Sequence, residues 1–415
     1  MKNVTTVQQC LPAGTGALAQ RTVFFLGLLI WLVSGNRPCL AGDAPGGGNV
    51  IRIASIFARS GPAAQAHIPS ALGVRWAVDE LNSNGGIQGL PVTLLELDNQ
   101  STPIGSKIAA DEAVAAGVSA VIGPAWSSHS MAAARVLQAG GIPMISNIST
   151  NPEVTRIGDC IFRVCCTDIF QGRILAEFAS REIEVKRVAI LRDLSSDYSI
   201  GLTRTFQTEF TRMGGLVPAV IDYRGRQQSF RELMDAIKMA RPDAVFLPGY
   251  DDSGPIVAEM ARSRLSVVVI GGDGWDIKSF FLKGGNRLAH GYYATHWNEA
   301  VDSVPSKSFY NRYKERTPFL APAALSYDAV YLLADAIRRA GSTSRPAIRE
   351  SLAATCGFEG VTGTLCFNRK RDPVKSMVIM KIIAGQPHYH KQVTPSLERE
   401  EAEKMARQAN AGTRK

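Results

Sequence analysis

Residues 120–153 read AVIGPAWSSHSMAAARVLQAGGIPMISNISTNPE, and this stretch decides the fold class. It begins with a short β-branched segment, Ala120 to Ile122, and continues into an amphipathic segment from Ser128 to Ala139. Two glycines end that segment, and a second strand-like run, Pro143 to Ser146, leads to another helix start. Alternation of strand and helix predicts parallel strands that are covered by helices on both faces.

The same alternation extends in both directions along the 415 residues. The predicted strands are 50–57, 92–97, 187–191, 217–223, 244–247, 267–271 and 374–383, and the predicted helices are 70–84, 104–116, 201–213, 230–240, 254–264 and 326–340. The length suits two domains of ordinary size. The sequence therefore predicts an α/β chain of two doubly wound parallel-sheet lobes, in which ligands bind beyond the carboxyl ends of the strands.

The N-terminus has the pattern of a secretory signal peptide. An apolar run from Val23 to Val33 follows Arg21 and precedes small residues that end at Ala41. The run is about half the length of a membrane span, which favours cleavage after Ala41 over an uncleaved anchor. Pro38 before Cys39 argues against a lipoprotein. Residues 1–41 hold three basic and no acidic residues, so cleavage lowers the net charge from +9 to +6 and places the mature protein in the periplasm.

The remaining cysteines are Cys160, Cys165, Cys166, Cys356 and Cys366. Cys356 and Cys366 flank a glycine-rich turn and could be bridged, and the sequence leaves one disulfide and buried free thiols equally open. The chain lacks the paired spacing of cysteines or histidines that zinc sites use, so we expect no metal and no cofactor.

The charge pattern argues against nucleic-acid binding. Basic residues are scattered and often have acidic neighbours, as in Arg181-Glu182, whereas nucleic-acid binders cluster them. The tail 396–415 mixes both signs and is interpreted as a solvated, mobile segment without an assigned role.

Hydroxyl side chains follow two adjacent predicted strands. Trp126-Ser127-Ser128 comes after the strand 120–122, and Ile148-Ser149-Thr150 comes after the strand 143–146. Free N–H groups at helix starts attract anions, so two such starts predict a corner that binds a carboxylate. The alternative, that each hydroxyl only caps its own helix, stays open.

The second half of the chain offers an acid and two aromatic residues at strand ends. Asp273 stands among glycines after the strand 267–271, where a carboxylate can accept from a ligand's ammonium group. An Asx-turn within the loop is the alternative. Tyr198 and Tyr250 also follow strands, and aromatic walls with a hydroxyl tip suit a partly polar ligand.

The sequence contains no motif that indicates an enzyme or a repressor. Ser127, Ser128 and His129 are sequence neighbours, which rarely face one another, and no Gly-x-Ser-x-Gly elbow, Walker motif or Gly-x-Gly-x-x-Gly fingerprint follows a strand. A repressor would begin with a helix-turn-helix module rather than a signal peptide. We therefore expect a binding protein and not an enzyme.

Several short motifs occur in a familiar order from about Val50 to Ile383. They are Ser60-Gly61-Pro62, Gly85-Gly86-Ile87-x-Gly89, Val121-Ile122-Gly123-Pro124, Thr150-Asn151-Pro152, Gly271-Gly272-Asp273-Gly274-Trp275 and Phe358-Glu359-Gly360-Val361-Thr362-Gly363. Together they resemble the type I periplasmic binding proteins, and within them the branched-chain amino-acid (Leu/Ile/Val) binding group.

The resemblance implies a periplasmic solute-binding component of an ABC importer that captures an amino acid, branched-chain or related, between two lobes joined by a three-segment hinge. Lobe I is expected at 49–167 plus 297–374, and lobe II at 168–296 plus 375–395. It further implies hinge-bending closure, a membrane permease as partner, no nucleic acid and a monomer. The alternative is a ligand-sensing periplasmic protein, or a carrier for an aromatic carboxylate, amide or urea-like solute.

Site residues follow from the matching positions. The resemblance assigns the ligand carboxylate to Ser127 and Thr150, with a backbone contact from Ile148, and the α-ammonium to Asp273. The expected ligand-binding set is Trp126, Ser127, Ile148, Ser149, Thr150, Tyr198, Tyr250 and Asp273. Two departures concern the wall around the ligand's side chain: Ala66 stands where an aromatic residue is common, and Ser101 and Trp126 stand where some members have a cysteine pair.

Overall fold

The computed structural model describes residues 50–224 and 230–395, which all belong to one compact unit, Ala44–Lys415. The expected signal peptide and the charged tail lie outside these residues. Within the described part, no helix combines the length and the apolar character that a membrane crossing requires.

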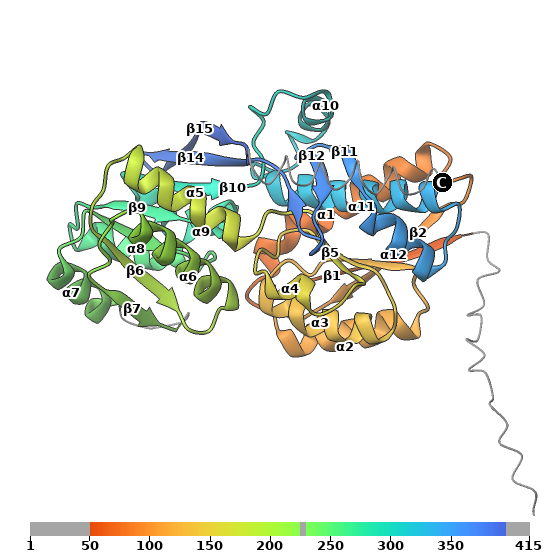
Figure 1. The fold of residues 1–415 in the computed structure, drawn as a ribbon, viewed down its shortest axis with the longest axis horizontal. Helices are drawn as coiled ribbons and strands as arrows, with labels where there is room; N and C mark the ends of the chain where they lie inside the picture. Colours follow the sequence, from red (N-terminus) through yellow and green to blue (C-terminus); the bar gives the residue numbers. More distant parts are fainter. Residues whose placement is uncertain (1–49, 225–229, 396–415) are drawn as a thin grey trace, which may run out of the picture. The chain divides into compact units, whose positions relative to one another are not determined.

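The first sheet contains five parallel strands in the order β2-β1-β3-β4-β5 (Figure 1). Its strands are β1 Ile51–Phe57, β2 Val92–Asp98, β3 Ala120–Ile122, β4 Met144–Ser146 and β5 Ile161–Arg163. The helices of this lobe are α1 Ala64–Ser83, α2 Pro103–Ala115, α3 Ser127–Ala139, α4 Glu153–Arg156, α10 Val304–Tyr313, α11 Ala321–Ala340 and α12 Arg345–Ala353. Side chains of β1 alternate between faces: Ile51 and Ile53 pack with α1 and α11, whereas Ala54 and Ile56 pack with α2 and α3.

The second sheet has seven strands in the order β15-β14-β10-β9-β8-β6-β7. They are β6 Val188–Asp193, β7 Val220–Tyr223, β8 Ala244–Leu247, β9 Val268–Gly271, β10 His290–Thr295, β14 Met377–Ile383 and β15 Gln386–Val393. The helices are α5 Asp168–Arg181, α6 Asp197–Arg212, α7 Arg231–Ala240, α8 Ser253–Arg262 and α9 Lys278–Lys283, with 3-10 turns η1 Asp273–Trp275 and η2 Gly285–Arg287. Strands β6 to β10 are parallel, and β14 and β15 extend one edge in antiparallel fashion.

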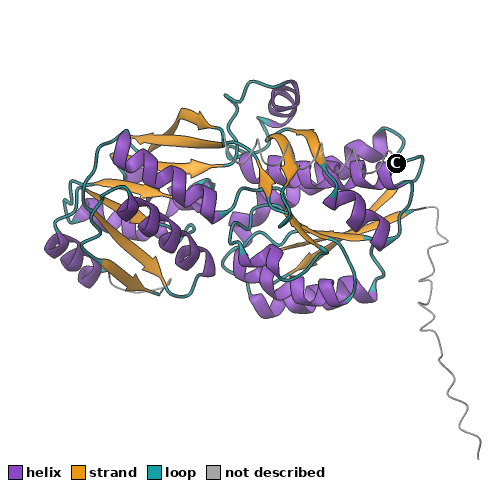
Figure 2. Ribbon diagram, viewed as in Figure 1, coloured by secondary structure: helices purple, strands orange, loops and turns teal. Residues whose placement is uncertain are grey.

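The chain passes between the two lobes three times, after β5, after β10 and before β14 (Figure 2). The segment between the last two passages returns to the first lobe, where α11 packs on α1 and a small sheet forms from β11 Cys356–Gly360, β12 Gly363–Phe367 and β13 Pro373–Val374. The predicted fold class, two parallel-sheet lobes with a three-segment connection, is confirmed by this architecture.

Three helices begin at least four residues earlier than the sequence pattern predicts: α1, α6 and α11, the last at Ala321 rather than at 326. Helix α1 starts at Ala64 rather than at 70. Pro69 lies inside it and lacks the N–H that would form one backbone hydrogen bond of the helix. Helix α6 starts at Asp197, where the Ser196 hydroxyl caps it by accepting from the Ser199 N–H (3.2 Å). Tyr198 therefore lies in a helical first turn and not in the preceding loop.

Cys356 and Cys366 are cross-strand partners in the β11–β12 hairpin and form a disulfide, whereas Cys160, Cys165 and Cys166 are buried and belong to no disulfide among the described residues. Closing a loop of this length restricts the unfolded chain by about 2–3 kcal/mol in the chain-entropy model. We expect the double variant Cys356→Ser/Cys366→Ser to lose about that much unfolding free energy in urea titrations. Thiol titration of the denatured mature protein without reductant should find three thiols; five would contradict the bridge.

Candidate functional site

A cavity lies between the two lobes, and residues of both lobes line it. Its volume is about 30 Å³, so a ligand can enter only if the side chains around the cavity move apart. The first lobe contributes Ala66, His67, Ser70, Ala125, Trp126, Ile148 and Pro322, and the second contributes Tyr250, Asp273, Gly274 and Ile277. Four of the eight predicted site residues therefore meet here: Trp126, Ile148, Tyr250 and Asp273.

Three aromatic rings form a column across the lobes. Trp126 of the first lobe stacks on Tyr250 with ring centroids 4.4 Å apart, and Tyr250 stacks on Tyr198 at 4.9 Å. Tyr198 is buried behind Tyr250, and its hydroxyl oxygen accepts from the Gly274 N–H (3.3 Å). The structure thus places Tyr198 as a support for Tyr250 and for the Asp273 loop, whereas Tyr250 forms the wall.

Ser127 is the first residue of helix α3 in the first lobe. Its hydroxyl oxygen accepts from the Asn151 N–H (3.3 Å), which joins the two helix starts that the sequence pattern singled out. Burial raises the pKa of Tyr250 well above its usual value, and the Tyr250 hydroxyl is hydrogen-bonded to the Ser127 backbone. The protonated Tyr250 hydroxyl of the second lobe therefore lies at the N-terminus of helix α3 of the first lobe.

Ser149 and Thr150 occupy different positions in the neighbouring loop. The Ser149 hydroxyl donates to the Ala125 carbonyl (2.8 Å) and lies 2.7 Å from the Ser130 hydroxyl, so its side chain is satisfied inside the first lobe. Thr150 is buried beside Asp168. Burial raises the pKa of Asp168 well above its usual value, and the nearby Asp273 adds to this effect.

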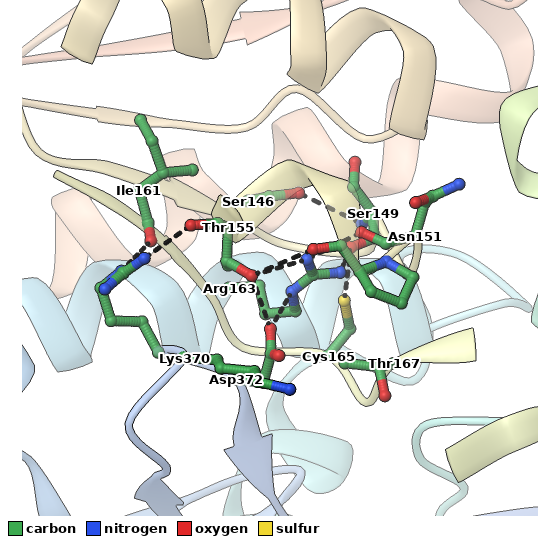
Figure 3. Close-up of polar contacts among 12 residues, drawn as sticks. Ser146, Ser149, Asn151, Thr155, Ile161, Arg163, Cys165, Thr167, Lys370 and Asp372 are labelled. Carbon is green, nitrogen blue, oxygen red and sulfur yellow. Dashed lines mark hydrogen bonds and ion pairs between the residues drawn. The ribbon is translucent and has the colours of Figure 1, made fainter. Parts of the chain in front are cut away.

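Arg163, at the end of β5, holds the loop that carries Ser149 and Thr150 in place (Figure 3). Its guanidinium is fully buried and donates to the carbonyls of Ser149 and Asn151, the latter at 2.8 Å. Its Nε lies 2.9 Å from a carboxylate oxygen of Asp372, a residue just before β13. The loop that carries Thr150 is therefore held through its backbone by a buried ion pair.

Asp273 supplies the acidic side of the cavity. Its carboxylate accepts from the Gln171 side-chain amide at 2.8 Å and lies 3.3 Å from Nε2 of His296. The Asp273 backbone N–H donates to Oε1 of the same Gln171 side chain (2.8 Å). These partners belong to α5 and to the segment after β10, so the carboxylate is oriented by other elements rather than by an Asx-turn in its own loop. Gly272 allows this approach, because a Cβ there would lie 2.2 Å from the Tyr198 hydroxyl.

His67 is a cavity residue that the sequence pattern did not identify. It lies in the first turn of α1, and its Nδ1 accepts from the Ala58 N–H (3.0 Å). Its ring is buried against Trp126, with centroids 5.1 Å apart in an edge-to-face arrangement. A polar residue in a helix's first turn after a strand is the same signal that identified Ser127, and it could have identified His67.

Burial lowers the pKa of His67 to about 3, with His129 as a secondary cause. An unfolded histidine binds its proton near pH 6.5. As the pH falls below that value, His67 binds a proton in the unfolded state but not in the folded state. The unfolding free energy therefore falls by up to about 1.4 kcal/mol per pH unit because of this residue. Urea titrations between pH 6.5 and 4.5 should show a shallower decline in His67→Asn than in the wild type. Identical slopes, or an equal change in the exposed control His388→Asn, would contradict this.

No group of histidine, cysteine, aspartate and glutamate side chains suited to a metal ion occurs among residues 50–224 and 230–395. The described site instead offers neutral donors on one lobe, a carboxylate on the other and aromatic walls between them. Two α/β lobes around such a cavity define a solute-binding protein of the two-lobed class.

The chain belongs to the periplasmic binding protein family, whose model matches residues 50–387. It is accordingly a solute-binding protein and not an enzyme. It is 30% identical to the Leu/Ile/Val-binding protein BraC3 of Rhizobium johnstonii over 296 residues, which are 70% of this chain and 80% of that protein.

Two solved structures share the fold at comparable identity. A leucine-binding protein LivK from Thermotoga maritima superposes with a TM-score of 0.79 at 31% identity, covering 83% of this chain and 99% of that one. The branched-chain amino-acid transporter substrate-binding protein LivJ from Streptococcus pneumoniae, solved with isoleucine, gives 0.78 at 29% identity, covering 83% and 100%. The resemblance to the Leu/Ile/Val-binding group is confirmed by these matches.

Proposed function

We propose that this protein is the periplasmic solute-binding component of an ABC importer and that it captures a free α-amino acid. The observation that supports this most is the polarity of the cavity, which is lined by Trp126, directly before the start of α3 at Ser127, in one lobe and by Asp273 in the other. A zwitterion would bridge the two lobes and favour closure. The isoleucine bound to LivJ and the names of the relatives support the same ligand class.

In this proposal Ser127, Thr150 and the Ile148 backbone hold the carboxylate, Asp273 accepts from the ammonium, and Trp126 and Tyr250 form the walls. Ser149 and Tyr198 support the site from behind. The lobes 49–167 plus 297–374 and 168–296 plus 375–395 move as bodies about the three connections. The signal peptide is cleaved after Ala41, and the mature monomer delivers its ligand to a membrane permease, without nucleic acid.

An aromatic carboxylate is the ligand class that competes with an amino acid. Trp126 and Tyr250 are already in ring-to-ring contact at 4.4 Å. A ligand ring between Trp126 and Tyr250 would need the centroids of these two side chains to be about 7 Å apart, which is twice the usual contact distance. The stack therefore favours a ligand that lies beside the rings rather than between them.

Isothermal calorimetry of the mature protein against the twenty amino acids, benzoate, simple amides and urea tests the proposal. We expect at least one amino acid to bind with a dissociation constant in the micromolar range or below. Binding of benzoate, amides or urea without binding of any amino acid would overturn the proposal.

A further inference from the structure

The cavity wall next to Trp126 includes His67, and the hydrogen bonding of its ring shows which nitrogen carries the proton. Nδ1 of His67 accepts from the Ala58 N–H, so the proton of the neutral ring resides on Nε2. The pKa of His67, lowered to about 3 by burial, keeps the ring neutral at physiological pH. Nε2–H is therefore an uncharged donor.

This donor is buried and has no hydrogen-bond partner among the described residues. His67 is 2% exposed and lines the cavity, and its ring neighbours are Phe57, Trp126 and His129. Nδ1 of His129 lies 3.3 Å from the Asn99 amide. Buried donors in folded proteins are nearly always paired, so an unpaired donor on a residue that lines a ligand cavity suggests a ligand acceptor as its partner.

The rest of this wall is largely apolar. Ala66, Ile148, Ile277 and Pro322 line it, and the Ser70 hydroxyl oxygen already accepts from the Asn147 amide (2.9 Å). Ala66, next to His67, adds only a methyl group to this wall. An uncharged donor in an apolar wall suits a neutral acceptor better than a carboxylate, whose charge would be buried without a counter-charge.

We propose that the cavity selects α-amino acids whose side chain carries a neutral hydrogen-bond acceptor, with a carboxamide as the representative case, and that Nε2–H of His67 donates to it. This proposal rests on the proposed function and deepens it by naming the ligand's side-chain class. His67 is thus a specificity-determining residue, whereas Ser127 and Asp273 hold the groups that all amino acids share.

L-Asparagine and L-leucine are nearly isosteric, so calorimetry with this pair isolates the acceptor. We expect the wild type to bind asparagine or its longer homologue glutamine at least tenfold more tightly than leucine. His67→Asn keeps an acceptor for the Ala58 N–H but withdraws the distal donor, and it should weaken carboxamide binding about 10- to 100-fold while changing leucine binding less than threefold. His67→Gln, which restores a distal N–H, should recover part of the loss.

Each other outcome overturns the proposal. Tighter binding of leucine than of both carboxamides would show that the wall selects apolar side chains while the proposed function stands. Equal weakening of leucine and asparagine in His67→Asn, with unchanged melting temperature, would assign His67 to the common carboxylate. Absence of binding for every amino acid would remove the proposed function itself, and this selectivity with it.

Discussion

Replacing Asp273 with asparagine should weaken amino-acid binding by a factor of about 100 or more. The carboxylate is 4% exposed and is oriented towards the cavity by Gln171 and His296. A buried ammonium group that loses its charged partner costs about 2–5 kcal/mol, most of which comes from the charge left unpaired. Asparagine preserves the shape of the side chain, so calorimetry would measure the loss of charge rather than of packing.

Asp276→Asn is the matched control for this experiment. Asp276 lies three residues further along, is buried, and accepts from the hydroxyls of Thr295 and Tyr293 outside the cavity lining. Its variant should bind the ligand within about threefold of the wild type. If Asp273→Asn retained wild-type affinity, the carboxylate would not be the ammonium partner.

Replacing Arg163 with methionine should lower the unfolding free energy by about 3–5 kcal/mol, because it leaves the Asp372 carboxylate buried without its ion-pair partner. The variant also removes two donors from the carbonyls of Ser149 and Asn151, so the loop that presents Thr150 loses its anchor. We therefore expect weaker ligand binding even under conditions in which the variant is fully folded. Urea titration and calorimetry measure the two effects separately.

Arg156→Met provides the comparison for Arg163. Arg156 is exposed on α4 and pairs with Glu153 one turn away, an arrangement that contributes less than about 1 kcal/mol. A loss in Arg163→Met no larger than that in Arg156→Met would mean that the buried ion pair does not support the loop. Loss of stability with unchanged ligand affinity would separate the ion pair from the site.

Much of the fold could be predicted from local pattern. The β-branched runs gave strands such as β3 and β8 with correct bounds, because each is buried on both faces and flanked by helices with clear polar starts. Strand β5 was missed since it has three residues, Ile161–Arg163, and ends in a buried arginine that breaks the apolar pattern. Helix α1 was shortened at Pro69, because a proline marks a helix start more often than a helix interior.

The sequence identified those site residues that directly follow predicted strands. Trp126 and Asp273 were found in this way, and both line the cavity. Gln171 was not, because its bonds to Asp273 join residues 102 positions apart and exist only after the second lobe has folded. The placement of Tyr198 behind Tyr250 depends on helix α6 beginning at Asp197, which no periodicity specified.

The central claim is that the cavity recognises a zwitterion, with the carboxylate at Ser127 and the ammonium at Asp273. The most direct test is calorimetry that compares the best-bound amino acid with its deaminated acid and its decarboxylated amine under identical conditions. The account predicts that each analogue binds at least about 100-fold more weakly, because each leaves one buried polar group of the site unpaired. If the deaminated acid bound as tightly as the amino acid, the protein would be a carboxylate carrier and the assignment of Asp273 would be wrong.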